Sequence, residues 1–223
     1  MTCPNCDPNM NIFKTGRFIV VTADLKHCKL CGDFIDPANY NKINLVNQKW
    51  DTYFHSICLA VSSKSSCLSR HIGAVLVRDQ SIVATGYNGP SRGIPHCGQD
   101  RLLHDQVLGN ELIHHLNGSP STMRKRIDIE CPRHIIGYTS GTHMELCPAQ
   151  HAEVNAISNA ARLGVSVLGS TLYMNCIIPC KNCFGALINA GVVKIVVDDV
   201  KVYDKHTQYL IDNSSIKIRR FEL

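Results

Sequence analysis

Two short motifs in the second half of the chain constrain its fold most strongly, because their side chains can act only when the fold brings them together. The motifs are His151-Ala152-Glu153 and Pro179-Cys180-Lys181-Asn182-Cys183. Zinc prefers nitrogen and sulfur ligands, and three protein ligands leave one of its four positions for water. Such an open site is typical of catalytic zinc, which makes water acidic enough to ionise near neutral pH. We therefore predict a catalytic zinc on His151, Cys180 and Cys183.

Glu153 completes this site as a carboxylate that does not bind the metal. A carboxylate in that place can carry a proton from water to a ring nitrogen and, later, a proton to a leaving amine. The combination of H-x-E with a later P-C-x-x-C is the signature of zinc nucleobase deaminases. The alternative is a buried histidine and an unrelated structural cysteine pair. A lone C-x-x-C would favour that alternative, whereas the two motifs together favour catalysis.

The size of the chain, 223 residues, allows a full core and suits one domain with a small appendage. Its formal net charge of +5 suits an anionic substrate such as a nucleotide, although many unrelated proteins share such a charge. No apolar run is long enough to span a membrane, and no secretory signal is evident. We expect a cytoplasmic protein whose 12 cysteines bind metal rather than form disulfides.

Residues 1–48 are predicted to form a separate module that resembles a zinc ribbon. Two C-x-x-C pairs at a spacing typical of a closed zinc site supply four ligands, Cys3, Cys6, Cys28 and Cys31. So short a segment has little core, and metal binding would supply its folding energy. A redox dithiol is the alternative. A structural or subunit-contact role is the first expectation for this module, and nucleic-acid contact is the second.

Strand and helix patterns alternate through residues 49–223, which is typical of an α/β layered fold. Helices are predicted at 49–66, 151–163 and 180–190 and within 98–130, and strands at 72–77, 81–85, 170–174, 192–197 and, at an edge, 214–223. His151 and Cys180 would then lie at helix N-termini, whose positive dipole ends favour thiolates. The stretch Gly86-Tyr87-Asn88-Gly89-Pro90 is either a simple turn or a loop that offers the Asn88 amide to a substrate sugar.

The chain from Trp50 to about Val197 resembles the deoxycytidylate (dCMP) deaminases of the cytidine deaminase-like superfamily. The resemblance rests on five stretches, Trp50–Phe54, Gly73–Val77, Gly86–Pro90, His151–Ile157 and Pro179–Cys183. It implies a three-layer α/β/α cytidine deaminase-like fold with a mixed sheet for residues 49–223. It also implies zinc-dependent hydrolytic deamination of dCMP to dUMP and ammonia, which supplies the precursor of dTMP.

The same resemblance implies roles for individual residues and a mode of regulation. Glu153 would be the catalytic proton shuttle, and Asn88 and Ala152 would bind substrate. The resemblance further implies a homohexamer that dCTP activates together with Mg2+ and that dTTP inhibits. The regulatory site of the family implies nucleotide binding by Gly86, Asn88 and Gly89.

Four further cysteines match positions at which related proteins hold metal ligands. We predict a second, structural zinc on Cys67, Cys97, Cys131 and Cys147, with His96 as the main substitute ligand. The alternative is four ordinary buried thiols. If the prediction holds, the chain carries three zinc ions.

The chain departs from the family pattern in residues 1–48 and in an insertion at about 98–130. These departures leave open the regulation and the exact substrate, including dCTP or a modified dCMP. Two other functions remain as alternatives, a deaminase that acts on polynucleotide through the zinc ribbon and a non-catalytic zinc-binding regulatory protein. Arg92 and Arg162 are candidates for phosphate binding because they are basic and close to the motifs.

Overall fold

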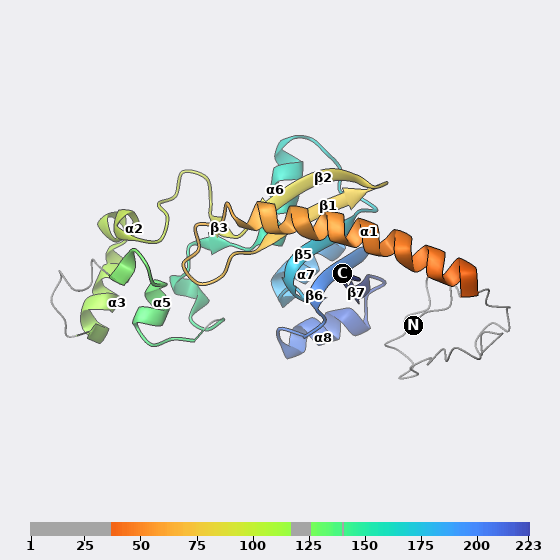
Figure 1. The fold of residues 1–223 in the computed structure, drawn as a ribbon. Coiled ribbons are helices and arrows are strands. Elements are labelled where there is room, and N and C mark those ends of the chain that lie inside the picture. The colour runs from red at the N-terminus through yellow and green to blue at the C-terminus, as the bar shows by residue number, and fades with distance from the viewer. Residues whose placement is uncertain (1–36, 117–125, 140) are drawn as a thin grey trace.

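The computed structural model describes residues 37–116, 126–139 and 141–223, with side chains from residue 47 onward. The four cysteines of the expected zinc ribbon, Cys3, Cys6, Cys28 and Cys31, lie outside the described residues. The described chain consists of a central sheet covered by helices and a smaller helical lobe at one end (Figure 1).

The central sheet has five strands in the order β2-β1-β5-β6-β7. Their bounds are β1 Gly73–Arg78, β2 Ser81–Tyr87, β5 Thr171–Ile177, β6 Lys194–Asp199 and β7 Lys217–Arg220. β1 pairs antiparallel with β2 and β5, whereas β6 pairs parallel with both β5 and β7. This mixed sheet confirms the predicted α/β fold, and β7 is the expected edge strand.

Helices cover both faces of the sheet and make three layers (Figure 1). Alternation along β1 shows why: Val75 and Val77 pack in a cluster with Phe54 of α1 (Pro37–Ser62), whereas Leu76 belongs to the opposite cluster with Ala156. Successive side chains of a strand point to opposite faces, so one apolar strand can bury both sides. The second face carries α6 (Ala152–Arg162), α7 (Lys181–Asn189) and α8 (Lys205–Asp212), the last of which is absent from the sequence-based predictions.

The strands predicted at 72–77 and 81–85 are confirmed as β1 and β2, and they form a hairpin. Its two turn residues, Asp79 and Gln80, have φ values of 51° and 60°. Positive φ at both central positions is the geometry of a type I′ turn, whose twist matches that of the flanking strands.

The first helix is longer than its sequence pattern indicates. It begins at Pro37 rather than near residue 49, and proline is favoured in a first helical turn because its φ is already helical. The apolar pattern that starts at Trp50 marks only the part of the helix that packs on the sheet. The helix therefore crosses the expected boundary at 48/49, and the division into residues 1–48 and 49–223 stays a prediction.

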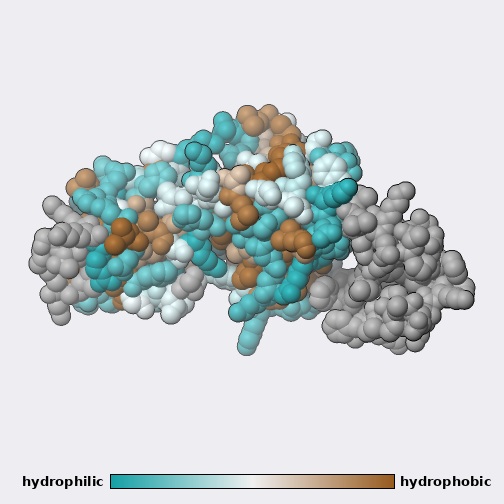
Figure 2. Space-filling view, viewed as in Figure 1, coloured by the Kyte–Doolittle hydropathy of each residue, from teal (hydrophilic) through white to brown (hydrophobic). Residues whose placement is uncertain are grey.

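The insertion and the short helix that follows it form a helical lobe beside the sheet. We call α2 (Gln99–His104), α3 (Gln106–Leu116) and α5 (Pro132–Ile135), with the described residues around them, the insertion lobe. It has its own apolar cluster of Leu108, Leu112, Ile127 and Ile135. Figure 2 shows some apolar surface on this lobe, where Leu103 and Val107 are exposed. In the parts of the chain that the structure describes, no helix is both long and apolar enough to cross a membrane.

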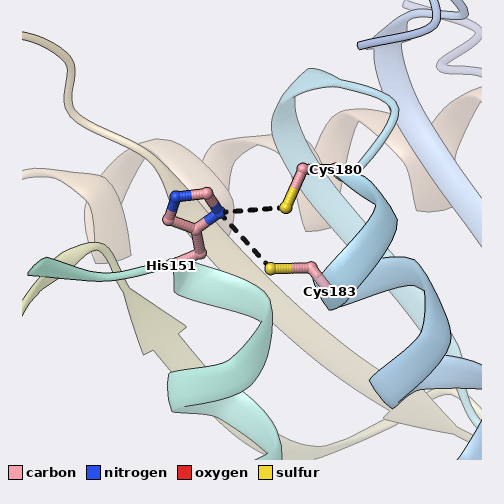
Figure 3. A group of neighbouring side chains, drawn as sticks. All are labelled: His151, Cys180 and Cys183. Atoms are coloured by element: carbon pink, nitrogen blue, oxygen red, sulfur yellow. Dashed lines mark hydrogen bonds between the residues drawn. The ribbon is translucent and has the colours of Figure 1, made fainter. Parts of the chain in front are cut away.

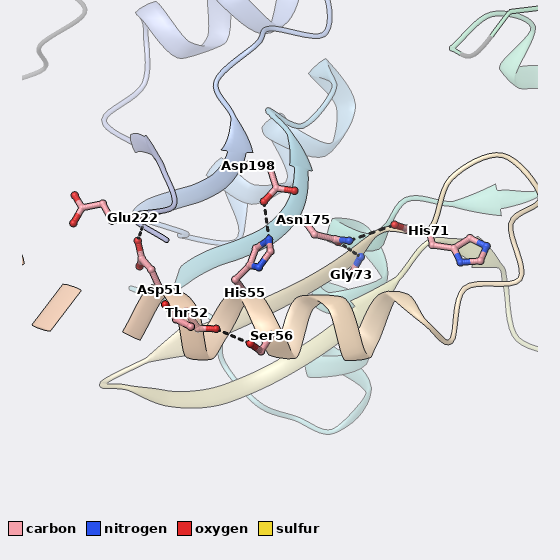
Figure 4. A network of polar contacts seen from close by, with 9 residues as sticks. All are labelled: Asp51, Thr52, His55, Ser56, His71, Gly73, Asn175, Asp198 and Glu222. Carbon is pink, nitrogen blue, oxygen red and sulfur yellow. Dashed lines mark hydrogen bonds and ion pairs between the residues drawn. The ribbon is translucent and has the colours of Figure 1, made fainter. Parts of the chain in front are cut away.

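A polar cluster fixes the C-terminal end of the chain to α1 (Figure 4). The buried carboxylate of Asp51 accepts two hydrogen bonds from the Arg219 guanidinium and one from the backbone N–H of Glu222. Nearby, His55 of α1 contacts Asp198 of β6 at 3.0 Å. These contacts join helix and strands that are distant in sequence.

Gly86 allows the close approach of β2 to α6, the helix that carries the metal motif. A Cβ there would lie 2.3 Å from Ala156 N and 2.4 Å from Ala152 O. We expect Gly86→Ala to lower the free energy of unfolding by about 1–3 kcal/mol, because backbone has to move. Gly89→Ala is the matched control, since its nearest atom would be 3.7 Å away. Urea denaturation measures both, and equal stability of the two variants would contradict the packing role.

Candidate active site

The three predicted metal ligands meet at the N-terminal ends of two helices (Figure 3). His151 occupies the N-cap position of α6, Cys180 occupies that of α7, and Cys183 lies in the first turn of α7. The His151 Nδ1 atom is 3.5 Å from Cys180 Sγ and 3.3 Å from Cys183 Sγ. Among the described residues, these three form the one group whose potential ligand atoms all lie within 4.8 Å of one another.

The distances suit a tetrahedral zinc ion. Zinc bonds of about 2.3 Å to sulfur and 2.0–2.1 Å to nitrogen imply a nitrogen–sulfur separation of about 3.6 Å. The two observed separations are 3.5 and 3.3 Å. Two thiolates and one imidazole are also a donor set that zinc favours, and they leave a fourth position open. The residues therefore fit a catalytic zinc.

The cysteine pair is poised to bind a cation. The pKa of Cys180 is lowered to about 4, chiefly because its sulfur accepts a hydrogen bond from Cys183. Burial opposes this shift, and a hydrogen bond with His151 adds to it. The same hydrogen bond from Cys183 raises the pKa of Cys183, because Cys183 is its donor. One sulfur thus holds negative charge at neutral pH, and metal binding displaces the remaining proton.

Glu153 lies in the first turn of α6, next to the ligands but outside their set. Its side chain is buried, and desolvation raises the pKa of the carboxyl group. The helix backbone and His151 act in the opposite direction. A carboxyl group with a raised pKa can both accept and release a proton near neutral pH, as a general acid–base requires.

A pocket opens beside the metal ligands and Glu153. Its wall also contains residues that the sequence motifs do not mark, among them Arg70, Arg133, Met144, Cys176 and Tyr203. Cys176 is half-buried and also lines the pocket. No linear motif identifies this set, because its members come from five separate segments.

The predicted substrate and regulatory residues lie close to this pocket. Ala152 and Asn88 line it, and both are buried. The Asn88 side chain donates to the Arg70 carbonyl and accepts from the Ile72 N–H, each at 2.8 Å. The amide therefore holds the loop that contains Arg70, and sugar recognition by Asn88 stays a prediction. Nucleotide binding by Gly86 and Gly89 also stays a prediction, since Gly86 already has a packing role.

The four cysteines of the expected second zinc site lie around the same region. Cys67 and Cys147 line the pocket, and Cys131 is buried at the start of α5. Burial raises the pKa of Cys97; Arg101 opposes that rise, and Cys147 and Cys131 add to it. Within the described residues, however, these four do not form a second group with ligand atoms within 4.8 Å. His96 contacts Ser66. The second zinc therefore stays a prediction.

Neither suggested phosphate ligand lines the pocket. Arg92 donates to the Asn159 side chain at 2.9 Å, and Arg162 is exposed in the last turn of α6. Proximity in sequence to a motif did not identify the cations of this pocket, because the chain folds Arg70 and Arg133 into it instead.

Comparison with known proteins agrees with this geometry. The model of the cytidine and deoxycytidylate deaminase zinc-binding region matches residues 48–198. The deoxycytidylate deaminase of Saccharomyces cerevisiae is 29% identical over 84% of this chain and 49% of its own length. That of Mycobacterium phage D29 is 30% identical over 66% of this chain and 92% of its own length. The apo crystal structure of dCMP deaminase from cyanophage S-TIM5 aligns with 83% of this chain and 99% of that chain, with 20% identity and a TM-score of 0.46. The chain spans about half the length of the yeast relatives.

Proposed function

The chain belongs to the cytidine and deoxycytidylate deaminase family, and on that premise we propose that it converts dCMP and water to dUMP and ammonia. The observation that carries the proposal is the convergence of His151, Cys180 and Cys183 with a buried Glu153 on one pocket. His151, Cys180 and Cys183 would hold the catalytic zinc.

The chain's own residues supply proton transfer and orientation. When bound, zinc supplies the Lewis acidity that lets water act as a nucleophile near neutral pH. Glu153 would accept a proton from the attacking water and deliver it to the ring nitrogen of cytosine. It would then help protonate the exocyclic amine, which leaves as ammonia. Burial holds this carboxyl group in place and raises its pKa, which assists the return of each proton.

The charge of the pocket supports a nucleotide over a free nucleoside. Two arginines, Arg70 and Arg133, line it, and Glu153 is the one carboxylate among the described lining residues. One carboxylate cannot balance two guanidinium groups, so the pocket lining is net positive away from the metal ligands. A phosphate group is the part of dCMP that such a field attracts.

A substrate panel tests the proposed reaction. Zinc-loaded protein should release ammonia from dCMP faster than from dCTP, methylated dCMP, CMP or a cytosine-containing oligonucleotide. Preference for dCTP or a methylated nucleotide would move the substrate within the same reaction class. Preference for the oligonucleotide would favour the polynucleotide alternative. Failure to deaminate any deoxycytidine nucleotide would overturn the proposed function and favour the non-catalytic alternative.

We also propose two structural zinc ions, one on Cys67, Cys97, Cys131 and Cys147 and one on Cys3, Cys6, Cys28 and Cys31. Elemental analysis of purified protein should then give three zinc ions per chain. Cys147→Ser should release one ion and lower the melting temperature, because closed zinc sites contribute folding energy. Cys58→Ser is the control, since this buried thiol belongs to the apolar cluster under α1. A single zinc per chain would contradict both structural sites.

The family resemblance supports further proposals about assembly and regulation. These are a homohexamer, activation by dCTP with Mg2+, inhibition by dTTP and a cytoplasmic location. Light scattering would measure the assembly, and rate measurements with each effector would measure the regulation. A monomer whose activity ignores both nucleotides would contradict the first three.

A further inference from the structure

The insertion lobe delivers one buried cation to the active-site pocket. Arg133 lies in α5, lines the pocket and is 5% exposed. An arginine is rarely so buried unless its charge is paired. In the described residues, its side chain makes one hydrogen bond, from Nη1 to the carbonyl of Thr142 at 2.5 Å.

The remaining donors of Arg133 form one free edge. Nε is buried and has no hydrogen-bond partner in the described structure. Nη1 is taken by Thr142, so the Nε–H and Nη2–H groups remain, and they point in parallel from the same side of the planar guanidinium. That pair is the fork that binds two oxygens of a carboxylate or phosphate. A buried donor without a partner is costly, so the arrangement suits a ligand that supplies the missing acceptor.

Two contacts, one from α5 and one from α2, fix the insertion lobe against the wall of the pocket. Next to Arg133, the His134 ring contacts the Ser69 hydroxyl at 3.4 Å. From α2, the buried Arg101 donates to the Leu146 carbonyl at 2.7 Å. Ser69 lines the pocket, and Leu146 directly precedes the lining residue Cys147. The lobe thus holds Arg133 in one place, so that little side-chain entropy is lost on binding.

The neighbouring charges leave the fork available for an anion. The charge of Arg133 contributes to the lowered pKa of Glu145, so the two groups are near each other. The exposed Glu145 carboxylate, however, pairs with His143 at 3.0 Å. Arg70, on the loop held by Asn88, is the second cation of the pocket. A phosphate monoester carries a charge of about −1.5 to −2 near pH 7, which two guanidinium groups can balance.

We propose that Arg133 is a specificity-determining residue that binds the phosphate group of the nucleotide through its Nε and Nη2 donors, with Arg70 as the second cation. This inference rests on the proposed function, and it adds that the insertion lobe supplies part of the substrate site. Arg133 follows the insertion at about 98–130, so the insertion would serve to position the residue that distinguishes a nucleotide from a nucleoside.

The test compares the binding of dUMP, the product, with the binding of deoxyuridine, which lacks the phosphate. Neither ligand carries an amine to be released, so no turnover occurs. Calorimetry on full-length, zinc-loaded protein should show that Arg133→Gln weakens dUMP binding roughly 10–100-fold, the usual value of a charge-assisted hydrogen bond. Binding of deoxyuridine should change by less than about twofold, because it lacks the phosphate. Arg133→Lys keeps the charge but loses the fork, and its affinity for dUMP should fall between wild type and Arg133→Gln.

Arg126→Gln is the matched control. Arg126 lies in the same lobe, pairs with the half-exposed Glu130 and is not among the residues that line the pocket. It should bind dUMP as wild type does. Unchanged dUMP affinity in Arg133→Gln, or equal losses for dUMP and deoxyuridine, would overturn the inference. Phosphate-selective binding that depends on Arg133 would support the inference even if the protein had no deaminase activity. Turnover of dCMP that Arg133→Gln leaves unchanged would keep the proposed reaction but overturn the phosphate-binding role of Arg133.

Discussion

Replacement of Glu153 by glutamine is expected to lower kcat for dCMP roughly 10²–10⁴-fold, the usual contribution of general acid–base catalysis. Glutamine has almost the same shape, so the buried space around α6 stays filled, but its amide cannot take up and return protons. Ammonia release measured at saturating dCMP would record the loss. The zinc content should stay equal to that of wild type, because Glu153 is outside the ligand group.

The control for this prediction is Glu145→Gln. Glu145 is an exposed carboxylate in the short helix η2 (Met144–Leu146), and its neighbour Met144 lines the same pocket. It should change kcat by less than about threefold, because surface charges near a site act weakly through water. A Glu153→Gln enzyme that keeps most of its activity would assign proton transfer to another group. A variant that loses zinc would show that the carboxylate supports metal binding instead.

The largest expected effect on stability comes from Asp51, which is fully buried in the middle of α1. Its carboxylate accepts hydrogen bonds from both Nη atoms of Arg219, so it ties the last strand to the first helix. It also accepts one from the Glu222 N–H (Figure 4). Asp51→Asn should lower the free energy of unfolding by about 3–5 kcal/mol, because it leaves a partly buried guanidinium without its counter-charge. Thermal unfolding should shift downward by about 10 °C for a chain of this size.

A second pair in the same strand provides the control. Arg220 and Asp199 also form an ion pair between β7 and β6, but their side chains are 59% and 45% exposed. Asp199→Asn should cost no more than about 1 kcal/mol, the usual range for exposed pairs. A double-mutant cycle of Asp51 with Arg219 would isolate the coupling between the two groups. If Asp51→Asn and Asp199→Asn have equally small effects, the buried pair does not stabilise the C-terminal edge.

Local patterns predicted the frame of the protein and the centre of its chemistry. Zinc ligands are recognisable because few residue types bind the metal, and the His151 and Cys180 motifs carry their own helix starts. The β1–β2 hairpin was predictable because strand alternation and a short polar turn are both local properties. The same is true of the strand and helix order that produces three layers.

Other features depend on contacts between distant segments, which no spacing in the sequence encodes. The sequence alone gave no reason to choose Arg133 over Arg92 or Arg162, since the choice depends on how the insertion lobe folds against the pocket. Likewise, Asn88 looked free to meet a ligand, whereas the structure uses its amide to hold the Arg70 loop.

The sequence by itself determined which atoms can hold zinc and move protons, because that chemistry resides in residue type and short spacing. The tertiary structure decided what surrounds them: the buried guanidinium that faces the pocket, the close contact at Gly86 and the Asp51–Arg219 pair. The physical reason is that burial and partnership are properties of three-dimensional packing. A charged side chain becomes a ligand site or a structural tie only when the fold removes it from water and selects its partner.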